Sequence, residues 1–394
     1  MKHPTTQTNQ FGVYADLLAT RPGDFVFFYQ RRVDEAPTER GFRGIYRVAG
    51  PPFVDRQPVD FGGNRVLGEC PHCKSQFSEK IVENKDGSHS AKCPNCKASL
   101  NPAEHILPNR LPLELVTYYG QPVDDNSAYI DRTDPGSLWT LIFRKQYGAG
   151  RERSINHMLP EEGLKIERLL AKANAGKATP TPSGFLQGYP NSYRSALPFQ
   201  LQKKTPFTVE SILYAWLNQN VDADEPVLRS ILGPPSAIEY FGNQVLYGIG
   251  GDTADYLVLH TKRSGENPAF EGTSSTSFDK SVREQEGRFA VTVIEIKKND
   301  VDLDTLKQVD RYAYYVAQVA TANCLPAPPR NLLVQPVLLG FSAAQELLQE
   351  VKRRSERRLQ LDYPGGASTH ALVTPAKVLT YGVHDGRLNL TRVV

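Results

Sequence analysis

The chain of 394 residues lacks any long apolar run. No apolar stretch approaches the roughly 20 residues that a helix needs to cross a bilayer. The first ten residues, MKHPTTQTNQ, are polar and do not contain the apolar core of a signal peptide. We therefore expect an intracellular, cytoplasmic protein with no membrane partner.

Charge of neither sign dominates. The sequence has 46 Lys and Arg against 43 Asp and Glu, a formal net charge of +3. This near balance permits an anionic partner without requiring one, because nucleic-acid-binding surfaces are usually local patches. The hydrophobic share of 40% and the charged share of 23% are typical of a folded chain, and the length suffices for two or three domains.

Cysteine is scarce, yet four of the five cysteines form two pairs. Cys70 and Cys73 belong to CPHC, and Cys93 and Cys96 belong to CPNC. Such pairs in a reducing compartment are metal ligands more often than disulfides. The segment between them contains Asp-Gly, a hairpin turn signal. We predict a zinc ribbon at about residues 66–102 with one structural zinc on four thiolates. A redox dithiol pair is the alternative.

The composition changes most clearly from Lys172 to Pro198, which is rich in Pro, Gly, Ser, Ala and Asn. This composition without a period is typical of a linker. We assign residues 173–205 to a linker between an N-terminal domain, 1–172, and a C-terminal domain, 206–394.

Hydrophobic patterns predict different architectures for the two domains. In the N-terminal domain we expect strands in 21–30, 41–55, 111–119 and 137–147 and a helix in 157–173. Several short strands with few helices favour a small β-barrel. In the C-terminal domain we expect helices in 208–220, 303–320 and 342–360, and strands in 244–250, 254–260, 288–298, 331–341, 378–383 and 387–394. That order predicts an α/β arrangement around a mixed sheet flanked by helices.

The motif Glu-x-Lys occurs three times, at 83–85, 295–297 and 350–352. Only the second copy, in VTVIEIKKND, ends a long apolar strand. Asp255 begins a strand that is expected to pair with it. Two carboxylates at adjacent strand ends can share Mg²⁺ or Mn²⁺, because Mg²⁺ uses few carboxylates together with water and phosphate oxygens. Lys297 can then orient water or neutralise developing charge.

Two further groups are expected near these residues. Gln308 and Tyr312 lie four residues apart on one face of a predicted helix. Glu210 lies in the first helix of the C-terminal domain and can supply a third carboxylate.

This series resembles the PD-(D/E)xK nuclease superfamily. It consists of a helix with Glu, a G-x-x-D strand, an E-I-K strand and a Q-x-x-R-Y helix. It is most similar to the RecB-like branch and to the C-terminal domain of archaeal and actinobacterial mismatch endonucleases. The resemblance covers about residues 206–394. It implies that Asp255, Glu295 and Lys297 are catalytic, with Glu210 and Gln308 in support.

The chain departs from the superfamily pattern at one position. The Pro that usually precedes the Asp is Ala254 here, and Asp252 is a rival carboxylate. Which of the two aspartates is the metal ligand therefore stays open.

The strands RPGDFVFFYQ and GFRGIYRVAGPPFVD resemble the EVE domain, a PUA-like barrel, over about residues 10–172 with the zinc ribbon as an insertion. The family implies a pocket for a flipped, modified base, often a modified cytosine. Phe11, Tyr14, Tyr29 and Trp139 are the candidates to stack on the base. Packing in the core is the competing interpretation for each aromatic residue.

Three functions fit these patterns. The first is a modification-dependent DNA endonuclease, the second a repair endonuclease for mismatched or branched DNA, and the third a non-catalytic reader of modified nucleic acid. Double-strand cleavage needs two active sites, which favours a homodimer. A basic run can contact phosphate or be a solvated face: Lys352, Arg353, Arg354, Arg357 and Arg358.

Overall fold

The computed structural model describes most of the chain, and every structural statement below refers to these residues. They are 7–30, 40–55, 65–70, 72–80, 82–83, 89–93, 95–100, 109–124, 155–179, 194–196, 201, 205–223, 225–246, 253–260, 290–323, 332–362 and 368–394. The strand expected in 137–147 lies outside them.

The described chain is α+β, with mixed sheets and helices. Its α-helices are α1 (Gln7–Leu18), α4 (Pro160–Ala173), α5 (Ser211–Asn220), α6 (Pro226–Leu232), α8 (Leu303–Asn323) and α9 (Gln345–Arg353). Two short 3-10 helices are η3 (Val221–Ala223) and η4 (Pro235–Ala237). No described helix is long and apolar enough to pass through a bilayer.

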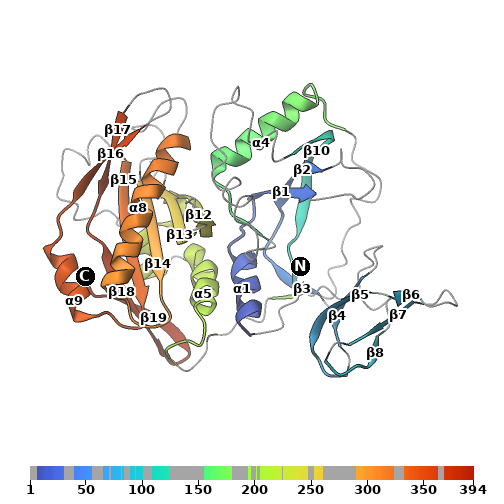
Figure 1. Cartoon of the computed structure of the whole chain (residues 1–394), viewed down its shortest axis with the longest axis horizontal. Coiled ribbons are helices and arrows are strands. Elements are labelled where there is room, and N and C mark those ends of the chain that lie inside the picture. Colours follow the sequence, from blue (N-terminus) through green and yellow to red (C-terminus); the bar gives the residue numbers. More distant parts are fainter. Residues whose placement is uncertain are drawn as a thin grey trace.

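The largest sheet belongs to the C-terminal part of the chain (Figure 1). Its strands are β12 (Ile238–Leu246), β13 (Thr253–His260), β14 (Ala290–Ile296), β15 (Leu332–Gly340), β16 (Arg357–Asp362), β17 (Ser368–Val373), β18 (Lys377–His384) and β19 (Arg387–Arg392). They run in the order β12-β13-β14-β15-β17-β16, with the β18–β19 hairpin beside the C-terminal half of β15. β12, β13 and β14 pair antiparallel, whereas β15 is parallel to β14, β17 and β18.

The centre of this sheet is buried on both faces. Every residue of β14, AVTVIEI, is buried, as expected for a strand between two helical layers. One face packs against α8 and α9, for example through Leu306 and Leu347. The other face packs against α5 and α6 through residues such as Leu213 and Ile231. Glu295 therefore lies near the end of a core strand.

Helix α8 makes the crossover that a parallel β14–β15 pair requires. Between β14 and α8, the chain passes closely over the end of β15. The Phe341 N–H donates to the Asn299 carbonyl at 2.7 Å. A Cβ on Gly340 would lie 2.8 Å from the same carbonyl oxygen, so glycine permits this approach. The segment that follows Glu295 is thus held against the sheet.

The described N-terminal strands form smaller sheets. β1 (Phe25–Gln30), β2 (Gly41–Val48) and β10 (Leu113–Val123) pair antiparallel with β2 in the centre. Helix α4 covers one face of this sheet, where Ile166 and Leu170 pack with Phe42 and Ile45. β3 (Phe53–Asp55), β9 (Asn109–Arg110) and β11 (Arg194–Ala196) form a second small sheet. Since β11 lies within 173–205, part of the expected linker is paired with the N-terminal part.

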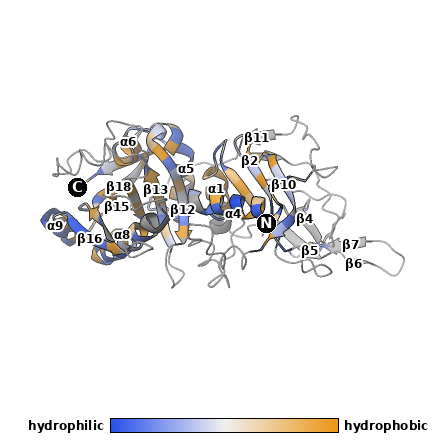
Figure 2. Cartoon of the chain, turned by 90° about the horizontal axis from the view of Figure 1, so that it is seen from above, coloured by the Kyte–Doolittle hydropathy of each residue, from blue (hydrophilic) through white to orange (hydrophobic). Residues whose placement is uncertain are grey.

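Helix α1 lies against α5 in both views of the molecule (Figures 1 and 2). Ala15 is buried in the same apolar cluster as Ile212. The Asn218 amide donates to the Ala15 carbonyl at 2.7 Å, and Arg21 pairs with Asp222 at 2.8 Å. An N-terminal helix thus completes the core on one side of the large sheet.

Several element predictions were wrong. The helix expected over 342–360 ends at Arg353, and 357–362 form strand β16, which pairs with β17. The basic run is therefore divided between a helix end and a strand. The strand expected in 244–250 begins earlier, at Ile238, and α1 and β17 were not predicted.

Candidate active site and metal centre

Asp255 and Glu295 lie on neighbouring antiparallel strands. The register pairs Tyr256 with Ile294, which places Asp255 across from Glu295. Both carboxyl groups are buried, with 7% and 1% of the residue exposed. The Ile296 N–H donates to Asp255 Oδ2 at 2.7 Å and links the two strands at this point.

Two side chains donate to the other oxygen of Asp255. Tyr214, on α5, donates from Oη to Oδ1 at 2.7 Å. Gln244, on β12, donates from Nε2 to the same oxygen at 2.6 Å. Asp255 is therefore held by three donors from three different elements.

Glu295 has a different environment. Lys297 donates from Nζ to Oε1 at 2.6 Å. The second oxygen, Oε2, is buried and has no hydrogen-bond partner in the described structure. A buried carboxylate oxygen without a partner is costly, because desolvation is not repaid by a hydrogen bond. Glu295 Oε2 is therefore available to accept a hydrogen bond or to bind a cation.

Both acids are harder to ionise than usual. Burial raises the pKa of Asp255 to about 6, although the Ile296 amide and Tyr214 oppose the shift. Burial and then the nearby Asp255 charge raise the pKa of Glu295 to about 8, against the effect of Lys297. Burial lowers the pKa of Lys297, but contact with Glu295 outweighs it and the net shift is upward, so the lysine stays charged. One ammonium therefore faces two carboxyl groups.

Glu210 and Gln308 reach the same pocket as Lys297. This open pocket has a volume of about 330 Å³, and its lining comprises Glu210, Lys297, Lys298, Asn299, Asp300, Asp302, Asp304, Thr305 and Gln308. As the sequence predicted, Gln308 and Tyr312 lie on one face of a helix, and the Gln308 amide donates to the Tyr312 hydroxyl. The structure thus brings five predicted residues to one region: Asp255, Glu295, Lys297, Glu210 and Gln308.

The segment after β14 fixes one wall of this pocket. The Lys298 N–H donates to Glu210 Oε1 at 3.4 Å, and the Lys298 ammonium donates to the Thr208 carbonyl at 3.2 Å. Tyr381, on β18, donates its hydroxyl to the Lys298 carbonyl. Glu210 is therefore tied to the segment that carries Lys297.

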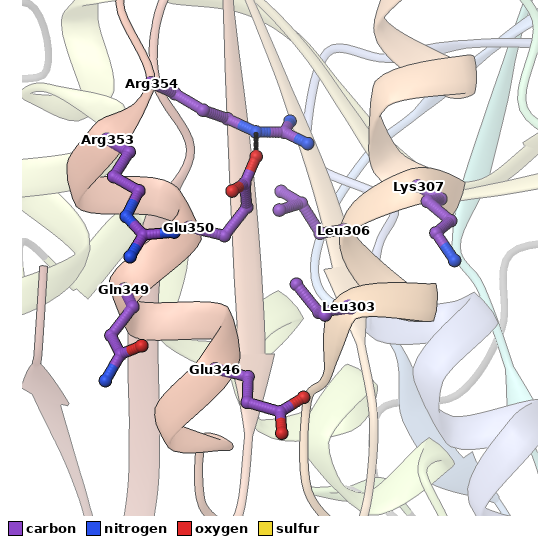
Figure 3. Close-up of a pocket in the computed structure, with 8 residues that line it drawn as sticks. All are labelled: Leu303, Leu306, Lys307, Glu346, Gln349, Glu350, Arg353 and Arg354. Atoms are coloured by element: carbon purple, nitrogen blue, oxygen red, sulfur yellow. Dashed lines mark hydrogen bonds and ion pairs between the residues drawn. The ribbon is translucent and has the colours of Figure 1, made fainter.

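A second pocket, of about 370 Å³, lies between α8 and α9 (Figure 3). Leu303 and Leu306 approach it from α8, while Glu350 and Arg354 face it from α9 and its end. Its two acids are Glu346 and Glu350, and none of the predicted catalytic residues lines it. We therefore locate the candidate chemistry beside the pocket of Lys297, which Glu210 and Gln308 also line, whereas Asp255 and Glu295 are not part of its lining.

The basic run is partly neutralised. Arg354 pairs with Asp310 and with Glu350, and Arg357 lies 2.6 Å from the same aspartate. Lys352, Arg353 and Arg358 are exposed. The sequence had indicated one helical run, which is wrong. Any phosphate contact rests on Lys352, Arg353 and Arg358, because Arg357 is also exposed but is paired with Asp310.

Four cysteines form the second cluster of chemically active side chains. The sulfur atoms of Cys70, Cys73, Cys93 and Cys96 lie within 4.8 Å of one another. Two cross-pair distances, Cys70 to Cys96 and Cys73 to Cys93, are both 3.6 Å. A tetrahedron with Zn–S bonds of about 2.3 Å has edges of about 3.8 Å, whereas a disulfide measures about 2 Å. The cluster can hold a structural metal such as zinc.

Both cysteine pairs have the same backbone geometry. The Lys74 N–H donates to the Cys70 carbonyl at 2.9 Å, and the Lys97 N–H donates to the Cys93 carbonyl at 3.0 Å. Both lysines have a φ of 60°, the left-handed conformation that closes each turn. Hydrogen bonds from Ser75 lower the pKa of Cys73 to about 5. A backbone hydrogen bond from Ala98 opposes the shift of Cys96, but burial and the other cysteines raise its pKa to about 12, so the thiols do not ionise alike.

Short strands connect the cysteine pairs. They are β4 (Arg65–Glu69), β5 (Gln76–Lys80), β6 (Val82–Glu83), β7 (His89–Lys92) and β8 (Ser99–Leu100). β6 and β7 pair antiparallel, as the predicted hairpin requires, and its Asp-Gly turn lies outside the described residues. Figures 1 and 2 place these strands at the far end of the molecule from α8 and α9, so the cysteine cluster is remote from Glu295.

The candidate base-binding aromatics do not gather in one place. Phe11 and Tyr14 lie on α1, with ring centroids 6.4 Å apart, and Phe11 packs on the α5 side of the core. Tyr29 lies on β1, 4.9 Å from the Phe42 ring, and the Arg40 Nε donates to its hydroxyl. Trp139 lies outside the described residues. A base-binding role for these four stays a prediction.

Sequence reasoning missed Tyr214 and Gln244. Nothing in the strand or helix patterns marks them, because their significance depends on the packing of α5 and β12 on β13. Asp252, the rival ligand, lies outside the described residues.

Comparison with known proteins finds no family model, no curated protein and no solved structure that matches the chain.

Proposed function

We propose that the chain is a metal-dependent DNA endonuclease, with its catalytic site at Asp255, Glu295 and Lys297. One observation carries the proposal. Glu295 is buried beside Asp255, uses one oxygen for Lys297 and leaves the other, Oε2, without a partner in the described structure. The resemblance of residues 206–394 to PD-(D/E)xK nucleases supports the same conclusion from the sequence.

The charges of the site favour a divalent cation. Two buried carboxylates face one ammonium, so a bound cation would offset the cost of ionising both acids. Asp255 and Glu295 would hold Mg²⁺ or Mn²⁺, which supplies a Lewis acid that activates water and neutralises phosphate. Within the described structure, only the cysteines form a compact group of three or more candidate ligands. Two carboxylates suffice for Mg²⁺, because water and phosphate oxygens complete its shell.

The other residues have supporting roles. Lys297 stays charged beside Glu295 and would orient the attacking water or neutralise the charge that develops on phosphate. Glu210 fixes the backbone of Lys298, and Gln308 faces the same pocket, where each would contact water or the substrate. This arrangement is suited to phosphodiester hydrolysis.

We further propose that the N-terminal part reads a modified base in duplex DNA and contains a structural zinc on its four cysteines. The reader role rests on the likeness of strands β1 and β2 to the EVE domain, a PUA-like barrel. A modification on a base edge is best inspected after flipping, which costs only a few kcal/mol. The zinc assignment rests on the four thiolates and their spacing. Cleavage of both strands would involve a homodimer.

Two alternatives remain. A repair endonuclease for mismatched or branched DNA would use the same catalytic residues with a different reader. A non-catalytic reader of modified nucleic acid would not need them. The presence of Asp255, Glu295 and Lys297 at one place favours catalysis.

A cleavage assay separates these functions. The full chain with Mg²⁺ or Mn²⁺ is given matched duplexes that are unmodified, cytosine-modified, adenine-modified or mismatched. We expect cleavage of a modified duplex, and Lys297→Ala should lower the rate at least 100-fold while binding and folding persist, because the lysine acts in the transition state. Lys307→Ala removes an exposed lysine paired with Asp304 and is the control. Cleavage by Lys297→Ala at the wild-type rate would rule out this site, and preference for the mismatch would favour repair.

A further inference from the structure

The Asp255 carboxylate has almost all of its acceptor capacity occupied. A carboxylate offers about four lone-pair sites, two on each oxygen. Oδ1 receives two donors, from Tyr214 and Gln244. Among the described residues, Oδ2 receives only the Ile296 N–H. One lone pair therefore stays open, and it lies on Oδ2.

Gln244 adopts a costly backbone conformation at this place. Its φ is +53°, in the left-handed region that non-glycine residues rarely occupy. The register pairs Asn243 with Tyr256 and Val245 with Ala254, so Gln244 lies across from Asp255. Strain of this kind is concentrated at functional sites, where the surrounding structure fixes it.

The orientation of the Gln244 amide follows from its other contact. Thr253 donates its hydroxyl to Gln244 Oε1 at 3.4 Å. The amide nitrogen then faces Asp255 Oδ1 at 2.6 Å and the Tyr214 hydroxyl at 3.2 Å. Gln244 is thus a donor to the carboxylate.

Tyr214 is fixed just as firmly. It lies on α5, and its carbonyl accepts a hydrogen bond from the Tyr256 hydroxyl at 3.0 Å. Burial, with the Asp255 charge, raises the pKa of the Tyr214 hydroxyl well above its usual value. The hydroxyl therefore keeps its proton and remains a donor at any working pH.

We propose that Tyr214 and Gln244 are positioning residues that hold the Asp255 carboxylate so that one lone pair of Oδ2 stays open for a divalent cation. The role rests on the proposed metal-dependent function. Across the strands, Glu295 Oε2 offers the second open acceptor. Each carboxylate would then bind the cation through one oxygen. Removing a residue that forms a hydrogen bond with a metal ligand typically weakens metal binding by 10–100-fold.

Matched variants test this role in the full chain. Tyr214→Phe removes one donor to Asp255. Tyr256→Phe removes another buried tyrosine hydroxyl, which donates to the Tyr214 carbonyl and to Asn218 but not to Asp255. Gln244→Asn shortens the amide beyond reach of Asp255, and Asn tolerates a positive φ better than Gln.

The first readout is Mn²⁺ affinity across pH, measured by electron paramagnetic resonance. We expect Tyr214→Phe and Gln244→Asn to bind about tenfold more weakly and to move the pH midpoint of binding upward. Tyr256→Phe should lower stability without either effect. Gln244→Asn also loses a hydrogen bond to a buried carboxylate, so the affinities are compared under conditions where every variant is fully folded.

The second readout needs no metal. The Asp255 carboxyl is titrated by ¹³C NMR in aspartate-labelled chain, with Asp255→Asn for assignment, and both variants should raise its midpoint. If the wild type binds Mn²⁺ and both variants have the same Mn²⁺ affinity and the same Asp255 midpoint as the wild type, the positioning role is overturned. Failure of the wild type to bind Mn²⁺ would overturn the proposed function instead, and the NMR titration would still decide whether Tyr214 and Gln244 hold Asp255.

Discussion

Glu295 combines deep burial with an acceptor that lacks a partner, and this has a consequence for stability. Burial and the Asp255 charge raise its pKa to about 8 in the folded chain, while an unfolded Glu ionises near 4.3. The proton is then bound more tightly by the folded state. The contribution of protonated Glu295 to the free energy of unfolding is fully present below about pH 4 and is lost as the pH rises through about 8.

Glu295→Gln tests this consequence, because glutamine does not ionise. In metal-free buffer the free energy of unfolding of the wild type should fall relative to that of the variant between pH 5 and 8. The expected fall is on the order of 4 kcal/mol, because each pH unit in this window contributes about 1.4 kcal/mol. Denaturant unfolding at several pH values measures it, with Glu346→Gln on the exposed face of α9 as the control. Mg²⁺ should stabilise the wild type and not Glu295→Gln. Parallel pH profiles for all three proteins would show that Glu295 ionises normally.

Among the elements, the core strands were the most predictable. β13 and β14 follow from uninterrupted apolar runs, and they carry Asp255 and Glu295 to adjacent positions. The helical period of 303–320 likewise predicted α8 and placed Gln308 and Tyr312 on one of its faces, where the structure joins them by a hydrogen bond. The residues that hold Asp255 could not be predicted, because Tyr214 and Gln244 acquire their role through contacts between elements.

Strand β16 shows why the other errors arose. Its sequence, RRLQLD, follows a charged helix and continues the same composition, so local preference favours more helix. In the fold, pairing with β17 extends the sheet, and Arg357 reaches Asp310 on α8. Tertiary contacts thus override the local signal. Helix α1 was not predicted because its sequence, QTNQFGVYADLL, has only a weak helical period. Its burial depends on contact with α5.

The short strands next to the cysteine pairs form a unit whose stability should depend on metal. β6 and β8 have two residues each, too few to form a core of their own. We expect one zinc per full chain by elemental analysis. Cys70→Ser should lose it and expose residues 65–100 to limited proteolysis, since structural zinc contributes several kcal/mol to folding.

Cys324→Ser, outside the pairs, is the control for loss of a thiol. The remote position of the cluster predicts that Cys70→Ser still binds Mn²⁺ at the site of Asp255. Purified chain with no zinc and unchanged proteolysis would contradict the ribbon.

For the whole molecule, the contact between α1 and α5 determines how the reader should be tested. Hydrogen bonds lead from the Ala15 carbonyl through Asn218 and Tyr256 to Tyr214, which donates to Asp255. A fragment 1–172 would expose the α1 face that is buried on α5, and the remainder would lose one wall of its core. Binding is therefore best measured on the full chain, with Lys297→Ala to prevent cleavage.

We expect this full-length variant to bind a duplex with a modified base at least tenfold more tightly than the same duplex without it, in fluorescence anisotropy at fixed salt. The preference should persist when metal is removed, because the proposed base-binding residues do not include the proposed metal ligands. Phosphate contacts contribute equally to both duplexes, so raising the salt should weaken both and leave the ratio unchanged. Equal affinity across cytosine and adenine modifications, together with tighter binding of a mismatched or branched duplex, would replace the modification reader with a repair function for the same nuclease site.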